Sequence, residues 1–158
     1  MIKMGDVNEL KAFIDFLKSN IGFDFNVNFF NDRLKVQKYV FLAKFLGWNH
    51  NYHYNLYIRG PYCSELADDY YNLDNLELYK SPINSLDQEK FVSLVYGKSI
   101  HWLEASSTMM SLYHNYQYQF KGNYGSKLIE TTHNLKPNIP IETLKQAYAD
   151  LMDNDLLN

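Results

Sequence analysis

The 158-residue sequence contains a single cysteine, Cys63, and no apolar run approaching the ~20 residues that a membrane-spanning helix needs. One cysteine excludes a disulfide within the chain and is compatible with a reducing compartment. The N-terminal segment MIKMGDVNELK lacks the apolar core of a secretory signal peptide. We therefore expect a cytoplasmic protein that does not associate with a membrane.

The sequence also lacks the short motifs that are typical of common catalytic, phosphate-binding and metal-binding sites. It has no Gly-rich phosphate loop, no HExxH or GxSxG motif and no paired-cysteine zinc pattern, so we expect no catalytic centre, no cofactor and no metal. His101 and Glu104 form an HxxE pair, but a metal site needs three or four converging ligands. Cys63 lies near a predicted helix start, beside acids that disfavour a thiolate. A hydrolase that uses His101, Glu104 or Cys63 is the enzymatic alternative.

Arginine is scarce, since Arg33 and Arg59 are the only two in the chain. The formal net charge of -3 argues against a surface that is basic throughout and binds nucleic acid. The charges are unevenly placed, however: residues 33–59 carry five basic side chains and no acid, whereas residues 65–77 carry five acids and no base. Two interpretations stay open: the blocks neutralise each other when they pack, or the basic block is a contact surface.

The composition is typical of a globular protein. Hydrophobic residues make up 46% of the chain and charged residues 21%. A chain of this length can bury about 70% of its unfolded surface in one core. Because no linker or repeat interrupts the sequence, we expect residues 1–158 to form a single domain.

Apolar residues at helical spacing predict that most of the chain is helical. The first predicted helix follows Asp6, which with Glu9 has the spacing of a capping box. Asn31 or Asp32 is expected to cap the second helix, which is apolar almost all round and should therefore be buried. The predicted helices span residues 7–19, 33–48, 61–75, 86–96, 98–116, 126–135 and 141–151.

Residues 52–58 alternate between apolar and polar side chains, which predicts a half-buried strand. Gly60 and Pro61 are expected to turn the chain into the next helix, with Pro61 near its first position. Leu78 and Tyr79 could form a second short strand antiparallel to the first. The expected fold class is therefore mainly α with a small two-stranded β ribbon, a winged-helix-like helical domain.

A narrow polar stripe interrupts the apolar helix at residues 33–48. Arg33, Gln37 and Lys44 fall on this stripe at 100° per residue. A structural interpretation pairs Arg33 or Lys38 with an acid of the next helix, either Asp68 or Asp69. A functional interpretation makes the stripe, together with Arg59, a patch that binds a partner. The candidate partner-binding residues are Arg33, Gln37, Lys44 and Arg59.

Two neighbouring segments, RLKVQKYVFLAKFLGW and YNLYIRGPYCSELADDYYNL, resemble the Panacea family and its archaeal and bacterial relatives. The hallmark of that family is a helix of the form RLKLQKLLYLA, then a strand that runs into Gly-Pro and a further helix. Gly60, Pro61 and Tyr62 match this structural motif, although Cys63 follows it and residues 113–124 fit no pattern. The resemblance places a family-like core at residues 31–80 and a C-terminal helical part at residues 86–152.

The resemblance implies a mostly helical domain that acts by binding other proteins. We therefore expect a non-enzymatic protein-interaction module, such as an antitoxin-like or mobile-element-associated regulator whose partner is a toxin encoded nearby. The alternative is a winged-helix DNA-binding transcriptional regulator. Its weakness is that the predicted helix at residues 61–75 is acidic and would be repelled by phosphate. The sequence gives no indication of the oligomeric state.

Overall fold

The computed structural model describes residues 4–75, 83, 85–116 and 124–157. The α-helices of this part of the chain are α1 (Met4–Ile21), α2 (Phe30–Lys44), α3 (Ser64–Tyr71), α4 (Gln88–Val95), α5 (Ile100–Tyr116), α6 (Gly125–Leu135) and α7 (Ile141–Asp153). Two strands, β1 (Asn55–Tyr57) and β2 (Gly60–Tyr62), pair antiparallel, and a short 3-10 helix, η1 (Leu73–Asn75), follows α3. The mainly helical fold with a small two-stranded ribbon is confirmed.

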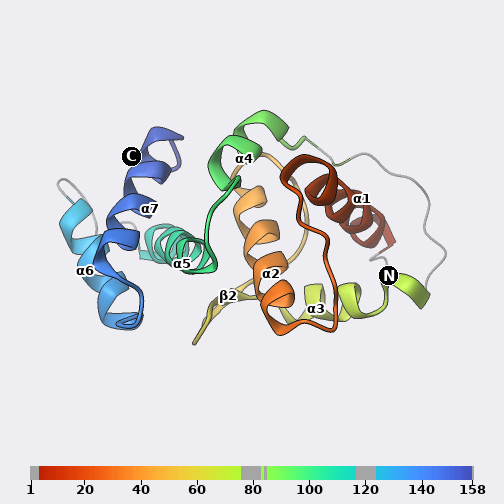
Figure 1. The fold of residues 1–158 in the computed structure, drawn as a ribbon, viewed down its shortest axis with the longest axis horizontal. Helices are drawn as coiled ribbons and strands as arrows, with labels where there is room; N and C mark the ends of the chain where they lie inside the picture. The colour runs from red at the N-terminus through yellow and green to blue at the C-terminus, as the bar shows by residue number, and fades with distance from the viewer. Residues whose placement is uncertain (1–3, 76–82, 84, 117–123, 158) are drawn as a thin grey trace.

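Helices α2 and α5 occupy the middle of the molecule (Figure 1). Helix α5 packs against α2 on one side and against α6 and α7 on the other. Helices α1, α3 and α4 lie on the α2 side, and the ribbon contacts both central helices. The ribbon therefore lies in contact with both central helices.

Helix α2 is buried on nearly all sides from Leu34 to Ala43, as its apolar pattern predicts. Aromatic contacts fix the neighbouring helices around it. The ring centroid of Phe13 in α1 lies 4.6 Å from that of Trp48 and 5.4 Å from that of Phe91 in α4. These rings form the part of the core between α1, α4 and the end of α2.

Helix α5 carries four small residues in succession, from Ala105 to Thr108, and none of them reaches solvent. The Ser106 and Ser107 hydroxyls donate to the Leu103 carbonyl of the same helix, at 3.2 and 2.6 Å. Their polarity is thereby satisfied locally, so neighbouring elements can approach α5 closely.

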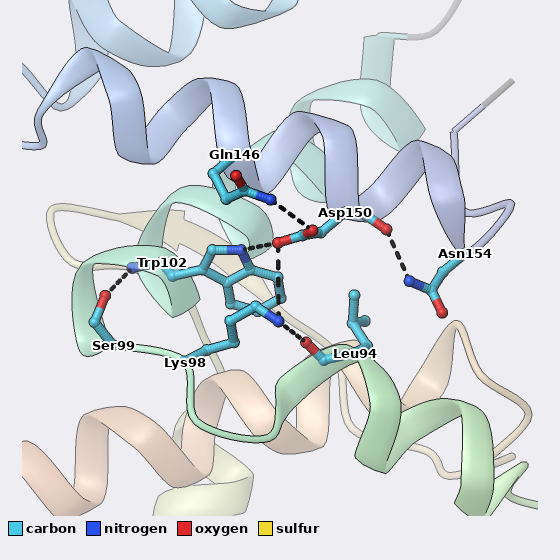
Figure 2. A network of polar contacts seen from close by, with 7 residues as sticks. All are labelled: Leu94, Lys98, Ser99, Trp102, Gln146, Asp150 and Asn154. Carbon is cyan, nitrogen blue, oxygen red and sulfur yellow. Dashed lines mark hydrogen bonds and ion pairs between the residues drawn. The ribbon is translucent and has the colours of Figure 1, made fainter.

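Polar side chains fix α7 on α5 (Figure 2). Asp150 of α7 accepts a hydrogen bond from the Trp102 indole at 2.9 Å and lies 3.8 Å from the Lys98 ammonium. Gln146 donates to the other Asp150 oxygen at 2.9 Å. The Lys98 ammonium also lies over the Trp102 ring, 5.0 Å from its centroid. The network joins α5 to α7, and each carboxylate oxygen of Asp150 accepts a hydrogen bond.

The ribbon differs from the predicted one. Strand β1 covers Asn55–Tyr57 and pairs with Gly60–Tyr62, so the Gly-Pro segment is itself a strand. Gly60 has φ of +100°, which closes a tight turn through Ile58 and Arg59. Leu78 and Tyr79, the predicted second strand, lie outside the described residues.

The expected half-buried strand at residues 52–58 was also wrong. Tyr52 is buried, but the chain then turns outward, and all three residues of β1 are exposed. Ile58, at the tip of the ribbon, is 86% exposed. The alternating pattern is present, but no helix or strand among the described residues covers the apolar side of the ribbon tip.

Three predicted helix starts were placed wrongly. Helix α1 begins at Met4, so Asp6 lies inside it rather than before it. Helix α2 follows Phe29, and Asp32 accepts instead from the Asn26 backbone at 2.9 Å. Helix α3 begins after Cys63, whose sulfur accepts from the Leu66 amide. A side chain that can accept a hydrogen bond can occupy several positions near a helix start. The residue type alone therefore did not identify the N-cap.

Candidate functional site: a pocket beside the ribbon

A pocket of about 420 Å³ lies between the ribbon and α2. We call it the ribbon pocket, and it is lined by Phe30, Leu34, Lys38, Tyr57, Ile58, Arg59, Gly60 and Tyr62. The helix places Phe30, Leu34 and Lys38 on one face because they are four residues apart. The turn of the ribbon supplies the opposite wall.

The outer part of the pocket is apolar and exposed. Phe30 in the first turn of α2 is 51% exposed and Tyr57 of β1 is 56% exposed. The Arg59 guanidinium lies 5.5 Å from the Phe30 ring centroid, and the Arg33 guanidinium lies 5.8 Å from it. We call Phe30, Tyr57, Ile58 and Arg59 the ribbon surface. It combines aromatic rings with one arginine, and tyrosine and arginine are among the residues that most often anchor protein interfaces.

The inner end of the pocket holds Lys38, which is only 2% exposed. No hydrogen bond or ion pair joins its ammonium to a residue that the structure describes. Burial lowers the pKa of Lys38 to about 8; the Glu104 carboxylate opposes this shift, and Lys136 and Arg59 add to it. A buried cation without a partner is costly for the fold.

A glycine leaves space beside this ammonium. A side chain at Gly60 would begin 3.4 Å from the Lys38 Nζ and 3.4 Å from the Thr108 Oγ1. The Thr108 hydroxyl is buried and finds no hydrogen-bond partner among the described residues. The Lys38 ammonium and the unsatisfied Thr108 hydroxyl thus border the same gap.

A buried ion pair lies near Lys38 and acts on its charge from both partners. Glu104 of α5 lies 3.5 Å from the Lys136 ammonium, and both side chains are buried. Lys136 also donates to the Tyr57 carbonyl at 3.2 Å, which ties the end of α6 to the ribbon. With Lys38 and Arg59 included, three cations and one carboxylate give this region a net charge of +2.

Gln37, a candidate partner-binding residue, has no exposed surface. Its amide oxygen accepts from the Cys63 N–H and its amide nitrogen donates to the Cys63 carbonyl, both at 2.9 Å. Gln37 therefore joins α2 to the segment before α3 and is not available to a partner. The sequence placed it correctly on the polar stripe, but the bonded residue lies 26 positions away.

The other candidates separate into two places. The guanidinium groups of Arg33 and Arg59 lie 5.8 and 5.5 Å from the Phe30 ring centroid, and Arg33 also donates to the Val27 carbonyl at 2.8 Å. Lys44 is exposed at the C-terminal end of α2 and donates to the Tyr52 carbonyl at 3.1 Å. The structure thus brings two of the four candidates together.

The predicted ion pair with α3 does not form among the described residues. Asp69 is buried and accepts from the Tyr52 hydroxyl at 2.5 Å, and Asp68 is exposed. Arg33 and Lys38 have no carboxylate of α3 as an ion-pair partner. The sequence analysis considered Lys38 only for this ion pair and did not place it in a pocket, although a lysine on an almost wholly apolar helix already indicates a buried cation.

The motif residues Gly60, Pro61 and Tyr62 form β2. Gly60 and Pro61 are buried, and Pro61 pairs with Leu56 in the ribbon register. Gly60 and Tyr62 line the pocket. The motif shapes the ribbon pocket instead of opening a helix.

The residues of the hydrolase alternative do not converge. His101 is exposed, whereas Glu104 is held by Lys136. Cys63 is buried as the N-cap of α3, and burial raises the pKa of its thiol. Within the described ranges, no three histidine, cysteine or acidic side chains are placed to hold a metal ion.

Comparison with known protein families, with curated proteins and with solved structures finds no match to this chain. The resemblance to the Panacea family therefore stays a prediction. None of the helices that the structure describes has the length and apolar character needed to cross a membrane.

Proposed function

We propose that this protein is a non-enzymatic interaction module that binds a partner protein over the ribbon surface. The observation that carries the proposal is the exposed apolar tip at Ile58, flanked by Phe30, Tyr57 and Arg59 around one pocket. Apolar surface gathered in this way on a small protein commonly marks a binding site. Aromatic and arginine side chains supply the anchors of such a site.

The resemblance to the Panacea family supports a narrower form of the proposal. In that form the protein is a cytoplasmic antitoxin-like or mobile-element-associated regulator, and its partner is a toxin encoded nearby. Two of the matched motif residues, Gly60 and Tyr62, line the ribbon pocket. The matched segment therefore overlaps the pocket beside the proposed docking surface.

DNA binding receives less support from the same elements. The helix before the ribbon, α2, is buried and cannot enter a groove. The helix after it, α3, exposes Glu65 and Asp68, which phosphate would repel. The cations of the region are few and are partly engaged with backbone carbonyls.

The test is to compare partner recovery by tagged wild type, Ile58→Lys and Tyr96→Lys from cells of the natural host. Tyr96 is the matched control because it is also exposed and follows α4, which lies away from the ribbon (Figure 1). We expect wild type and Tyr96→Lys to recover one stoichiometric partner. Ile58→Lys should recover at least about tenfold less, as for the loss of one interface anchor. Equal recovery by both variants would contradict the proposal.

A further inference from the structure

We propose that the ribbon pocket binds a small amphipathic carboxylate, with the carboxylate on Lys38 and the apolar tail running along Phe30 and Leu34 to the rim. The pocket adjoins the proposed docking surface, but ligand binding can be measured on the isolated protein, without a partner. It accounts for a feature that the docking proposal leaves unexplained, which is the cation at the inner end of an apolar pocket.

The need for an acceptor comes from Lys38 itself. Its ammonium has three donors, and no described residue accepts a hydrogen bond from it. Glu104 is the carboxylate whose charge acts on Lys38, and it already forms an ion pair with Lys136. A ligand that brings its own anion would restore the balance of charge at this position.

The chemical class of the ligand follows from the walls. The outer pocket presents the Phe30 ring, Leu34 and Ile58, and its surface is almost entirely apolar. A peptide would bring backbone N–H and C=O groups that these walls cannot satisfy. A simple acid has all its polar atoms at one end, so its tail matches the walls and its head matches Lys38.

The size and charge of the site also fit a small acid. A pocket of about 420 Å³ lies within the range of small-molecule sites. A dianionic phosphate would need more donors than the inner end offers, where Lys38 faces the pocket and the Thr108 hydroxyl lies across the Gly60 gap. One carboxylate matches one ammonium.

The direct test measures binding of sodium octanoate and of 1-octanol to the isolated full-length protein by calorimetry at pH 7. The two probes have the same chain length and differ in the charged head. We expect octanoate to bind at least tenfold more tightly than octanol. Lys38→Met should abolish that preference while octanol still binds. Lys35→Met, on the same helix but beside the Phe23 ring, should leave both affinities unchanged.

The pH dependence gives a second readout. Octanoate affinity should fall between about pH 8 and pH 10 as the Lys38 ammonium loses its proton, whereas octanol affinity should stay constant. The other titratable and charged groups facing Lys38 are Glu104, Lys136, Arg59 and the phenols of Tyr57 and Tyr62. The Lys38→Met variant should lose the pH dependence.

Three results would overturn the proposal. They are equal affinity for octanoate and octanol, no saturation by octanoate below about 1 mM, and unchanged octanoate binding by Lys38→Met. Amide chemical shifts locate the bound probe, and changes centred on Gly60 and Lys38 are expected. Thermal unfolding confirms that each variant is folded. Equal partner recovery by Ile58→Lys and Tyr96→Lys, with octanoate binding intact, would contradict the docking proposal alone, so the two can fail separately.

Discussion

At the scale of single residues, Lys38 is the side chain whose placement costs the fold most visibly. The downward shift of its pKa from 10.5 to about 8 means that the folded state disfavours the charged form. That shift corresponds to a penalty on the order of 3 kcal/mol at neutral pH, at 1.36 kcal/mol per pKa unit. At neutral pH the buried charge of Lys38 therefore lowers the stability of the fold.

Replacing this lysine should therefore stabilise the protein. Lys38→Met keeps most of the side-chain volume and removes the buried charge, so we expect the free energy of unfolding at pH 7 to rise by about 1–3 kcal/mol. Between pH 8 and 10.5 the unfolded lysine holds a proton that the folded one has released. The wild type therefore gains stability over this range, and its difference from Lys38→Met should shrink. Urea unfolding at pH 7, 8 and 10 measures this, and a destabilised variant would contradict it.

His50 should make the protein sensitive to acid. Its Nε2–H donates to the Val40 carbonyl at 3.1 Å and its Nδ1 accepts from the Tyr52 amide at 3.2 Å, so the folded state holds the neutral ring. Burial lowers the pKa of His50 from 6.5 to about 4, and the Lys44 and His53 charges act in the same direction.

Stability linked to His50 is complete above pH 6.5 and is lost as the pH falls toward 4, because only the unfolded ring binds a proton in that range. We expect the free energy of unfolding to fall by up to about 1.4 kcal/mol per pH unit there. His50→Gln cannot titrate and should flatten the profile, which urea unfolding at several pH values tests. His114, whose pKa is also lowered, contributes in the same sense and is unchanged in the variant. Parallel profiles for both proteins would contradict the assignment.

At the scale of elements, the helices were predictable because their apolar spacing is local information. The burial of α2 and the existence of α4 to α7 follow from short stretches of sequence. The ribbon was not predictable in the same way, because strand pairing joins separate segments. A Gly-Pro pair is compatible both with a helix start and with a strand entered at positive φ, as at Gly60.

The turn after α2 offers a sharper test at this scale. Gly47 has φ of +103°, and a side chain there would overlap the Ser85 carbonyl oxygen. Gly22 has φ of +72° with open space around it, so it isolates the backbone effect. We expect Gly22→Ala to cost about 1–2 kcal/mol of unfolding free energy. Gly47→Ala should cost at least about 1 kcal/mol more because of the overlap. Equal losses in urea unfolding would show that the two segments are not in contact.

At the scale of the whole molecule, neighbouring charge blocks did not dictate the ion pairs. The predicted pairing of the basic block with α3 fails among the described residues, while Glu104 pairs with Lys136 from the C-terminal part. Gln37 shows the same limit, since its stripe position was predictable but its bonds to Cys63 were not. Side-chain partners depend on tertiary packing, so the sequence could name Arg33 and Arg59 as candidates but could not place both beside the Phe30 ring.

The most direct measurement of the central claim is photo-crosslinking in the natural host. A photoreactive phenylalanine analogue is placed at Ile58 in one strain and at the control position Tyr96 in another, and crosslinked products are identified by mass spectrometry. Both positions are exposed, and the same photoreactive residue is introduced at each of them. The account predicts one dominant protein crosslinked from position 58 and little from position 96. Equal or no crosslinking from the two positions would contradict it.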